Sequence, residues 1–264
     1  MVNLKNEETE AEVTRLMEMR EYYEEFSDKQ KGSCEVREFL ANAFKDDALL
    51  LRYLIGRKYR PKHAWETIRS YAEVRFDKYP EMFPATLPPK DFLFRDNEPI
   101  FGILKGRDSK GRRIVYFKLN GWDMKKFSLD ELIMLTVPIV EKALWDDDCL
   151  KNGLVFVHDC SGASFTHARH YTMSIMLRVI NIYWFSFPLM FKGAYYVKIP
   201  SFLTYIYAMM KPFLPKKLKE RILILTPNQG LTDLHERLPP NILPKFLGGN
   251  LETNEAVDHQ FFEF

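Results

Sequence analysis

The sequence predicts an α/β protein in which an N-terminal all-helical bundle precedes an α/β domain. Within roughly the first 80 residues, apolar side chains recur at helical spacing. A proline cluster between residues 80 and 89 then marks a linker. Beyond it, short β-rich runs alternate with helical stretches, which is typical of a sheet with crossover helices. We therefore expect a helical domain over 1–85, a second domain over 92–250 and a C-terminal tail over 251–264.

Composition excludes several protein classes. The 264 residues are 46% hydrophobic and 28% charged, which excludes a disordered chain. The net charge of +2 argues neither for nor against nucleic-acid binding. The three cysteines are odd in number and widely spaced, which indicates a reducing, cytoplasmic location and no disulfide framework.

No targeting or membrane-spanning segment is expected. Residues 1–26 contain eight Glu and lack the apolar stretch of a secretory signal. The longest uncharged apolar run lies between Arg178 and Lys192 and has 13 residues. A bilayer span needs about 18 or more.

The N-terminal domain is predicted from helix start and stop residues. A charged helix is expected over 1–31 and a short amphipathic helix over 36–44. Asp47 is a candidate cap for a helix that ends at Gly56. Pro61 suits the first turn of the next helix.

The second domain is predicted to begin with a β-hairpin. Its strands are Ile100–Leu104 and Arg113–Leu119. Ser128 and Glu131 form a capping box that opens a helix to about Leu144. Further elements are a buried strand, Leu154–Asp159, a helical region over 164–184 and two short strands, Tyr195–Lys198 and Ile222–Leu225.

Two motifs superficially resemble cofactor sites. Gly106 and Gly111 have the spacing of a phosphate-binding loop, but Arg112 follows where that loop needs Lys and then Ser or Thr. We interpret this segment as the hairpin turn. His167 and His170 lie one helical turn apart, but no carboxylate or Cys completes a metal site nearby. We expect no metal and no cofactor.

A hydrolytic site at His158, Asp159 and Ser161 is the enzymatic alternative. Neighbouring residues on a strand point to opposite faces, so His158 and Asp159 cannot jointly serve one nucleophile. We expect no catalytic residue and no enzyme activity.

The apolar stretch 201–210 is the most informative region. Its helix has an apolar face and an opposite side that is hardly more polar, which fits either a buried core helix or a lid over a cavity. Basic residues follow it, and a second basic cluster lies over 52–62. Either cluster fits a solvated face or a membrane surface. The nearby aromatic residues have helical core spacing, so a nucleic-acid platform is not expected.

At this point the chain resembles the CRAL-TRIO (Sec14-like) lipid-binding family. The resemblance is closest to the branch of the α-tocopherol transfer protein, the cellular retinaldehyde-binding protein and the clavesins. It covers nearly the whole chain. The matching segments are Leu50-Leu51-Arg52-Tyr53-Leu54, Ala64-Trp65, Asp108-x-x-Gly111-Arg112, Asp159-x-x-Gly162, Ser186-Phe187-Pro188-Leu189, Lys211-Pro212-Phe213-Leu214, Lys219-Glu220-Arg221-Ile222 and Leu243-Pro244-x-x-Leu247-Gly248-Gly249.

The resemblance implies a large hydrophobic cavity closed by a helical gate, here about residues 201–210. It implies phosphoinositide binding by the basic residues that match the family pattern, which are Arg57, Lys192, Lys217 and Arg221. Met190 stands where a further basic residue is expected. Leu189 replaces the acidic residue of phosphatidylinositol-transferring members, which favours a small apolar ligand. Lys198 replaces an Asn that is frequent in the family.

We expect the protein to be a monomeric cytoplasmic carrier that associates transiently with membranes. Its expected cargo is one tocopherol-, retinoid- or carotenoid-like lipid. Release is expected at phosphoinositide-containing membranes. Thr136 or Tyr183 is expected to orient the polar end of the ligand. The alternative is a lipid-sensing adaptor whose protein partner binds Glu7–Glu25. The expected pocket residues, each either wall or core, are Ile133, Thr136, Val137, Val140, Phe165, Val179, Ile182, Tyr183, Phe187, Leu189, Phe202, Ile206, Met209 and Met210.

Overall fold

The computed structural model describes residues 2–29, 31–214 and 216–264, without the side chains of 2–9, 28, 210 and 218. The chain divides into two compact units. The first unit comprises Met1–Phe83 with Val179–Leu189, and the second comprises Pro84–Arg178 with Met190–Phe264. Residues 179–189 therefore fold with the helical unit, although they lie inside the second domain as expected from sequence.

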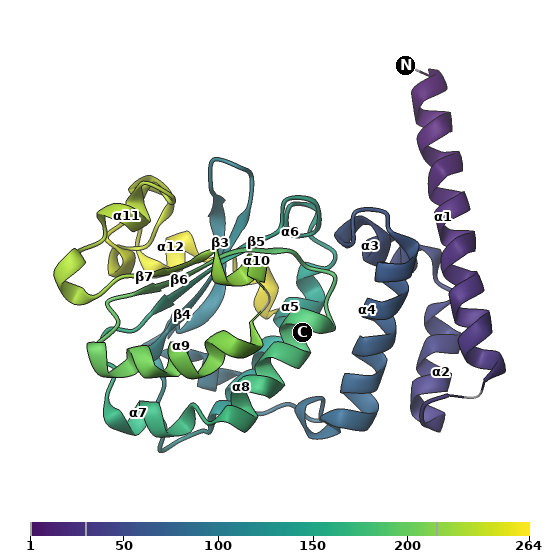
Figure 1. The fold of residues 1–264 in the computed structure, drawn as a ribbon. Helices are drawn as coiled ribbons and strands as arrows, with labels where there is room; N and C mark the ends of the chain where they lie inside the picture. The colour runs from purple at the N-terminus through teal and green to yellow at the C-terminus, as the bar shows by residue number, and fades with distance from the viewer. Residues whose placement is uncertain (1, 30, 215) are drawn as a thin grey trace. The chain divides into compact units, whose positions relative to one another are not determined.

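The first unit is helical. Its helices are α1 (Val2–Asp28), α2 (Cys34–Ala43), α3 (Asp47–Gly56) and α4 (Pro61–Glu73), followed by a π-helical turn (Val74–Lys78) (Figure 1). Pro61 occupies the first turn of α4, as predicted. The cap of α3 differs from the prediction. Asp46 accepts the amide N–H of Leu49 at 3.0 Å, because the capping residue precedes the helix and Asp47 is already its first residue.

Aromatic rings form much of the core of the first unit. Phe26 and Phe44 lie edge-on to Trp65, with ring centroids 5.3 and 5.7 Å apart. Met19, Leu40 and further apolar side chains of α1 to α4 complete this cluster. The apolar face predicted for the N-terminal helix therefore packs against the other helices. Nowhere in the described chain is a helix both long enough and apolar enough to cross a bilayer.

The second unit is built on a five-stranded sheet with the order β3-β4-β5-β6-β7. The predicted hairpin is confirmed, since β3 and β4 are antiparallel, and β4 to β7 are parallel. A small antiparallel pair, β1 (Phe94–Arg95) and β2 (Glu98–Pro99), precedes the sheet. The sheet strands are β3 (Phe101–Arg107), β4 (Arg113–Lys118), β5 (Leu154–Asp159), β6 (Phe191–Val197) and β7 (Ile222–Ile224).

The connections from β4 to β7 cover one face of this sheet. Right-handed crossovers that always move to the next strand place their helices on the same side. Figure 1 accordingly shows α7, α8 and α9 along one side of the sheet. The helices of these connections are α5 (Leu129–Ala143), α6 (Asp147–Asn152), α7 (Phe165–His170), α8 (Met173–Val179), α9 (Thr204–Met210) and α10 (Lys216–Lys219).

Two helix predictions in this unit have different outcomes. The Ser128–Glu131 capping box at the start of α5 is confirmed. The helical region predicted over 164–184 is confirmed, and it is divided at Tyr171 and Thr172, which separate α7 from α8. A π-helical segment (Ile180–Phe185) then follows α8.

The C-terminal part of the chain covers the opposite face. Side chains from β4 to β7 form one apolar cluster with residues of this part, which includes α11 (Thr232–His235) and α12 (Thr253–Ala256). Val257 pairs with Leu104 of β3 as an isolated antiparallel bridge. The amide of Asp258 then donates to the carbonyl oxygen of Ile103 at 2.8 Å. The C-terminal segment 251–264 is thus packed into the second unit.

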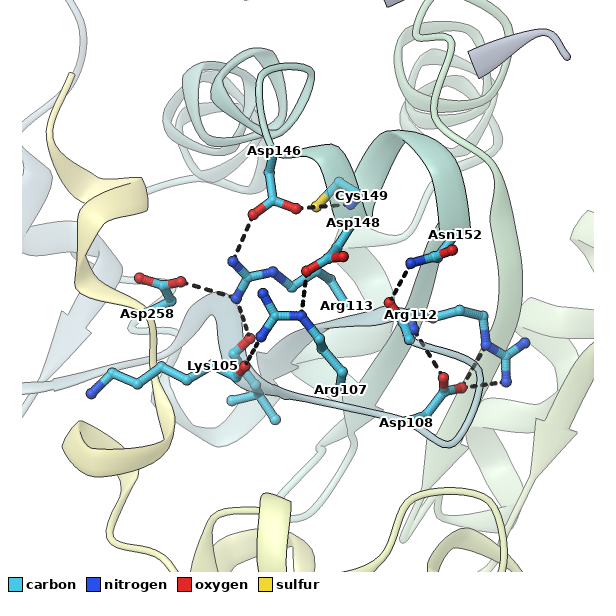
Figure 2. A network of polar contacts seen from close by, with 12 residues as sticks. Lys105, Arg107, Asp108, Arg112, Arg113, Asp146, Asp148, Cys149, Asn152 and Asp258 are labelled. Carbon is cyan, nitrogen blue, oxygen red and sulfur yellow. Dashed lines mark hydrogen bonds and ion pairs between the residues drawn. The ribbon is translucent and has the colours of Figure 1, made fainter. Parts of the chain in front are cut away.

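A buried arginine fastens the C-terminal segment to the sheet. Arg113, at the start of β4, donates to Asp146 at 2.6 Å and to Asp258 at 3.0 Å (Figure 2). Asp146 also caps α6, where it accepts the amide of Cys149. One guanidinium therefore joins β4, α6 and the C-terminal segment.

The Asp-x-x-Gly-Arg motif forms the hairpin turn that the sequence predicts. Asp108 accepts the backbone N–H groups of Lys110 and Arg112 and pairs with the Arg112 guanidinium, as Figure 2 shows in part. Gly111 has a φ of +70°, a conformation that favours glycine. The side chain of Asp108 holds this loop in its turn, and the turn requires a glycine at position 111. No bound nucleotide is needed to explain Gly111.

Candidate functional site

The two faces of the sheet are packed differently. Paired residues of parallel strands share a face, so the register of β4 to β7 defines both sets. The set directed toward the C-terminal elements is almost entirely buried. On the side of the crossover helices, β4 and β5 begin with Arg113 and Leu154. The residues that follow on this side are here named the inner face and are Val115, Phe117, Phe156, His158, Ala194, Tyr196, Ile222 and Ile224.

The inner face is incompletely buried at its centre. Along β6, Tyr195 and Val197 on the opposite face are buried, whereas Ala194 and Tyr196 on the inner face are only half-buried. Phe156 of β5 is half-buried in the same way. Both strands are central in the sheet, so an edge position does not explain this exposure. Apolar side chains beneath a helical layer thus retain accessible surface.

The α5 residues predicted for the pocket are buried. Ile133, Val137 and Val140 are each less than 10% exposed. The hydroxyl of Thr136 donates to the carbonyl oxygen of Ile133 at 2.9 Å, within the helix itself. Its proton is therefore already engaged, which weighs against Thr136 as the donor that orients a ligand.

The predicted residues of 179–189 lie in the first unit. Ile182, Phe187 and Leu189 are fully buried there. Phe187 lies edge-on to Tyr71 at 5.4 Å and is stacked with Tyr183 at 6.4 Å. Packing within the first unit is thus sufficient to explain their burial. Val179 and Tyr183 are half-buried.

The predicted gate lies at the surface of the second unit. In α9, Thr204 and Tyr205 are exposed and Ile206 and Met209 are half-buried, which excludes the buried core helix. The side chain of Met210 lies outside the described residues.

The ring of Phe202, just before α9, makes an exposed aromatic contact. It is half-buried and stacks on Phe165 of α7, with ring centroids 4.2 Å apart. Phe165 is 67% exposed. Phe165 therefore lies at the surface, whereas the sequence led us to expect it in the enclosed wall of a pocket.

The segment that leads to α9 contains Lys198, which has a strained backbone and forms an ion pair. Lys198 has a φ of +54°, which is uncommon for a residue with a side chain. Its ammonium lies 3.6 Å from the buried carboxylate of Asp159 and donates to the carbonyl oxygen of Phe246 at 2.5 Å. These contacts hold the backbone in the left-handed conformation that Asn adopts more readily.

Three of the residues expected to bind phosphoinositide lie near the amino ends of β6 and β7. Arg221 donates to the carbonyl oxygen of Phe191 at 3.0 Å, and Lys192 is the next residue of β6. Lys217 is exposed on α10, which packs against β6. The structure thus gathers Lys192, Lys217 and Arg221 in one region.

Arg57 belongs to the first unit and is engaged there. Its guanidinium donates to the hydroxyl of Thr67 and to the carbonyl oxygen of Phe187, each at 2.7 Å. Burial lowers the pKa of this guanidinium. Gly56 beside it lets the backbone approach Pro188, because a Cβ there would lie 2.2 Å from the Pro188 carbonyl oxygen. Arg57 therefore has a structural role in fixing the segment 186–189.

The residues of the enzymatic alternative do not converge. His158 lies on the inner face, whereas Asp159 lies on the opposite face beside Lys198. The amide of Ser161 donates to Asp159 in a local turn. His167 also has a structural role, because its Nδ1 accepts the amide of Ser164 in the capping box of α7.

Sequence reasoning missed the strand residues of the inner face. Phe156, Ala194 and Tyr196 are central there, yet no strand residue is among the pocket residues expected from sequence. Their alternation with buried neighbours is visible in the sequence of β6. Which face of a strand is incompletely packed depends on strand pairing and on the helices above it.

Comparison with known proteins places these features in context. The family model described as the CRAL/TRIO domain matches residues 97–249. Human clavesin-2 is 31% identical over 226 residues, which cover 82% of this chain and 68% of clavesin-2. The mouse α-tocopherol transfer protein-like protein is 32% identical over 206 residues, 77% of this chain and 58% of that protein. The crystal structure of Sfh5 shares the fold, with a TM-score of 0.52 at 15% identity over 80% of this chain and 75% of Sfh5.

Proposed function

Because the chain belongs to the CRAL/TRIO family of lipid-binding and lipid-transfer proteins, we propose that it carries one small hydrophobic lipid between membranes. The ligand occupies the space between the inner face and the crossover helices. One observation carries this proposal: the central strands β5 and β6 keep half-buried apolar side chains beneath a layer of helices. Filling that space with an apolar skeleton removes their remaining surface from water, at about 25 cal/mol per Å².

The position of Tyr196 supports an interior binding space. Burial disfavours the phenolate and raises the pKa of Tyr196 to about 12, with smaller contributions from Cys160 and Tyr207. The side chain is nevertheless only half-buried by surface area. The phenol of Tyr196 is thus surrounded by protein atoms and keeps some accessible surface. This combination is typical of the wall of an internal cavity rather than of the outer surface. Tyr207, which contributes to this pKa shift, lies on α9, the proposed gate.

Release is proposed to use α9 as a gate. Its exposed Tyr205 and the exposed Phe165 give this side of the second unit an apolar surface that water does not favour and a membrane interface does. Lys217 on α10 lies just beyond the gate and attracts anionic lipid, together with Lys192 and Arg221. Opening is favoured because an open gate gains more from the membrane than a closed gate does.

Charge reversal tests this release step. Lys217→Glu is expected to slow lipid transfer between phosphoinositide-containing vesicles several-fold, with unchanged loading of the protein. Lys110→Glu is the matched control, because Lys110 is equally exposed but lies on the β3–β4 hairpin at the other edge of the sheet. Equal transfer rates for both variants and the unmodified chain would exclude the phosphoinositide role of this region.

A lipid-sensing adaptor is the second candidate. Val13 and Met17 lie one turn apart on α1 and are 51% and 60% exposed, which gives this acidic helix an apolar strip suited to a protein partner. An adaptor retains its lipid while the partner is bound. Transfer that is complete within seconds would favour the carrier, and a lipid retained for hours would favour the adaptor.

A further inference from the structure

The inner face carries an imidazole in an otherwise apolar setting. His158 lies near the carboxyl end of β5 and is 8% exposed. Its ring is surrounded by those of Phe117, Phe156 and Tyr196, with centroids 5.0 to 5.9 Å away. Its Nε2 is buried and has no hydrogen-bond partner within the described part of the chain.

A second polar group without a partner lies beside it. The hydroxyl of Tyr171 is buried and likewise makes no hydrogen bond to the described residues. The ring of Tyr171 is 6.5 Å from that of His158 and is held edge-on to Trp122. Buried polar groups are hydrogen-bonded in the great majority of cases. Two neighbouring exceptions at an incompletely packed face are therefore suited to a shared external partner.

The surroundings select an uncharged partner. Burial lowers the pKa of His158 to about 3, so its imidazole is neutral at physiological pH. Burial also raises the pKa of the phenols of Tyr171 and Tyr196, which stay protonated. The inner-face residues around His158 carry no charge, and Arg113, which begins the same side of β4, is already paired with Asp146 and Asp258. An ionised head group placed here would lose its water without gaining a counter-charge.

We propose that His158 and Tyr171 bind the polar end of the carried lipid, and that this end is a neutral hydroxyl or carbonyl group on an otherwise apolar skeleton. Nε2 of an imidazole donates or accepts according to its tautomer, and a phenol does both, so either oxygen group finds a complementary partner. This inference rests on the proposed carrier function and narrows its ligand class.

Competition between matched probes tests the assignment. The full chain is incubated with phosphatidylcholine vesicles that contain equal amounts of phytanol and phytane, which differ by one hydroxyl group. The protein is re-isolated, and the bound probes are extracted and quantified by mass spectrometry. Phytanic acid in place of phytanol tests the exclusion of an ionised group. The variants are His158→Phe and Tyr171→Phe, which keep an aromatic ring at each position.

The unmodified chain is expected to take up phytanol over phytane by about tenfold, with about threefold from each of the two proposed hydrogen bonds. His158→Phe and Tyr171→Phe should each lower this preference by about threefold, with phytane uptake retained. Tyr116→Phe is the control, because its hydroxyl lies on the opposite face and donates to the carbonyl oxygen of Pro99.

Each other result has a defined meaning. Uptake of both probes with a preference that neither variant changes would overturn the assignment and leave the carrier function standing. Preferential uptake of phytanic acid would overturn the neutral ligand class. Uptake of no probe by any form would overturn the carrier function together with this inference.

Discussion

Replacing Arg57 separates a structural role from a lipid-binding role. Arg57→Ala removes two hydrogen bonds of 2.7 Å, to Thr67 and to the Phe187 carbonyl oxygen. A hydrogen bond to a charged group contributes about 1.5–3 kcal/mol, so two contribute about 3–6 kcal/mol. The guanidinium is only partly buried, and water replaces part of the loss. We expect the free energy of unfolding to fall by about 3 kcal/mol.

Arg57→Lys is the matched control, because it keeps the charge but loses the planar fork that reaches both acceptors. It should lose about half as much stability as Arg57→Ala. Urea unfolding followed by circular dichroism measures both, and sedimentation with phosphoinositide vesicles measures membrane binding. An unchanged unfolding midpoint with lost vesicle binding for Arg57→Ala would refute the structural reasoning and favour direct lipid contact.

Three further predictions concern the second unit. Arg113→Met should cost about 3–5 kcal/mol in urea unfolding at pH 7, because it leaves two carboxylates poorly compensated. Although burial raises the pKa of Asp146, its hydrogen bonds to Arg113 and Cys149 lower it overall, below the ordinary 3.8. This stability is therefore present above about pH 4 and lost as the pH falls further, so the difference between variant and unmodified chain should shrink at pH 3. Lys198→Asn should lower the free energy of unfolding, measured by thermal unfolding, by about 2 kcal/mol. The loss of the partner of the buried Asp159 then outweighs the relief of the strained backbone at position 198. Phe156→Ala should lower the free energy of unfolding by less than the about 3–5 kcal/mol typical of a Phe in a packed core, and it should reduce lipid uptake. A loss of about 3–5 kcal/mol with unchanged lipid uptake would contradict a lipid-binding space at the inner face.

Local features of the fold were predictable from sequence because their determinants are local. The Ser128–Glu131 capping box, the hairpin turn built on Asp108 and the proline at the start of α4 each depend on residues within a few positions. The cap of α3 was misplaced by one residue because Asp46 and Asp47 are chemically equivalent candidates, and only the backbone distinguishes them.

Long-range features were beyond the sequence patterns. The guanidinium of Arg57 donates to a carbonyl group 130 residues further along the chain, a contact that local spacing does not predict. Segment 179–189 packs with the N-terminal helices, although its apolar pattern resembles that of the second domain. The inner face becomes visible only when the register of β4 to β7 is known. These features arise from tertiary packing, which local spacing does not encode.

The central claim is that one apolar lipid is held against the inner face. Organic extraction of the purified full chain after incubation with lipid vesicles, followed by quantitative mass spectrometry, tests this claim most directly. We expect a single class of neutral apolar lipid at about one molecule per chain in these extracts. Extracts of the Phe156→Ala variant should contain much less of this lipid. Extracts without lipid, or with phosphatidylinositol as the stoichiometric component, would contradict it.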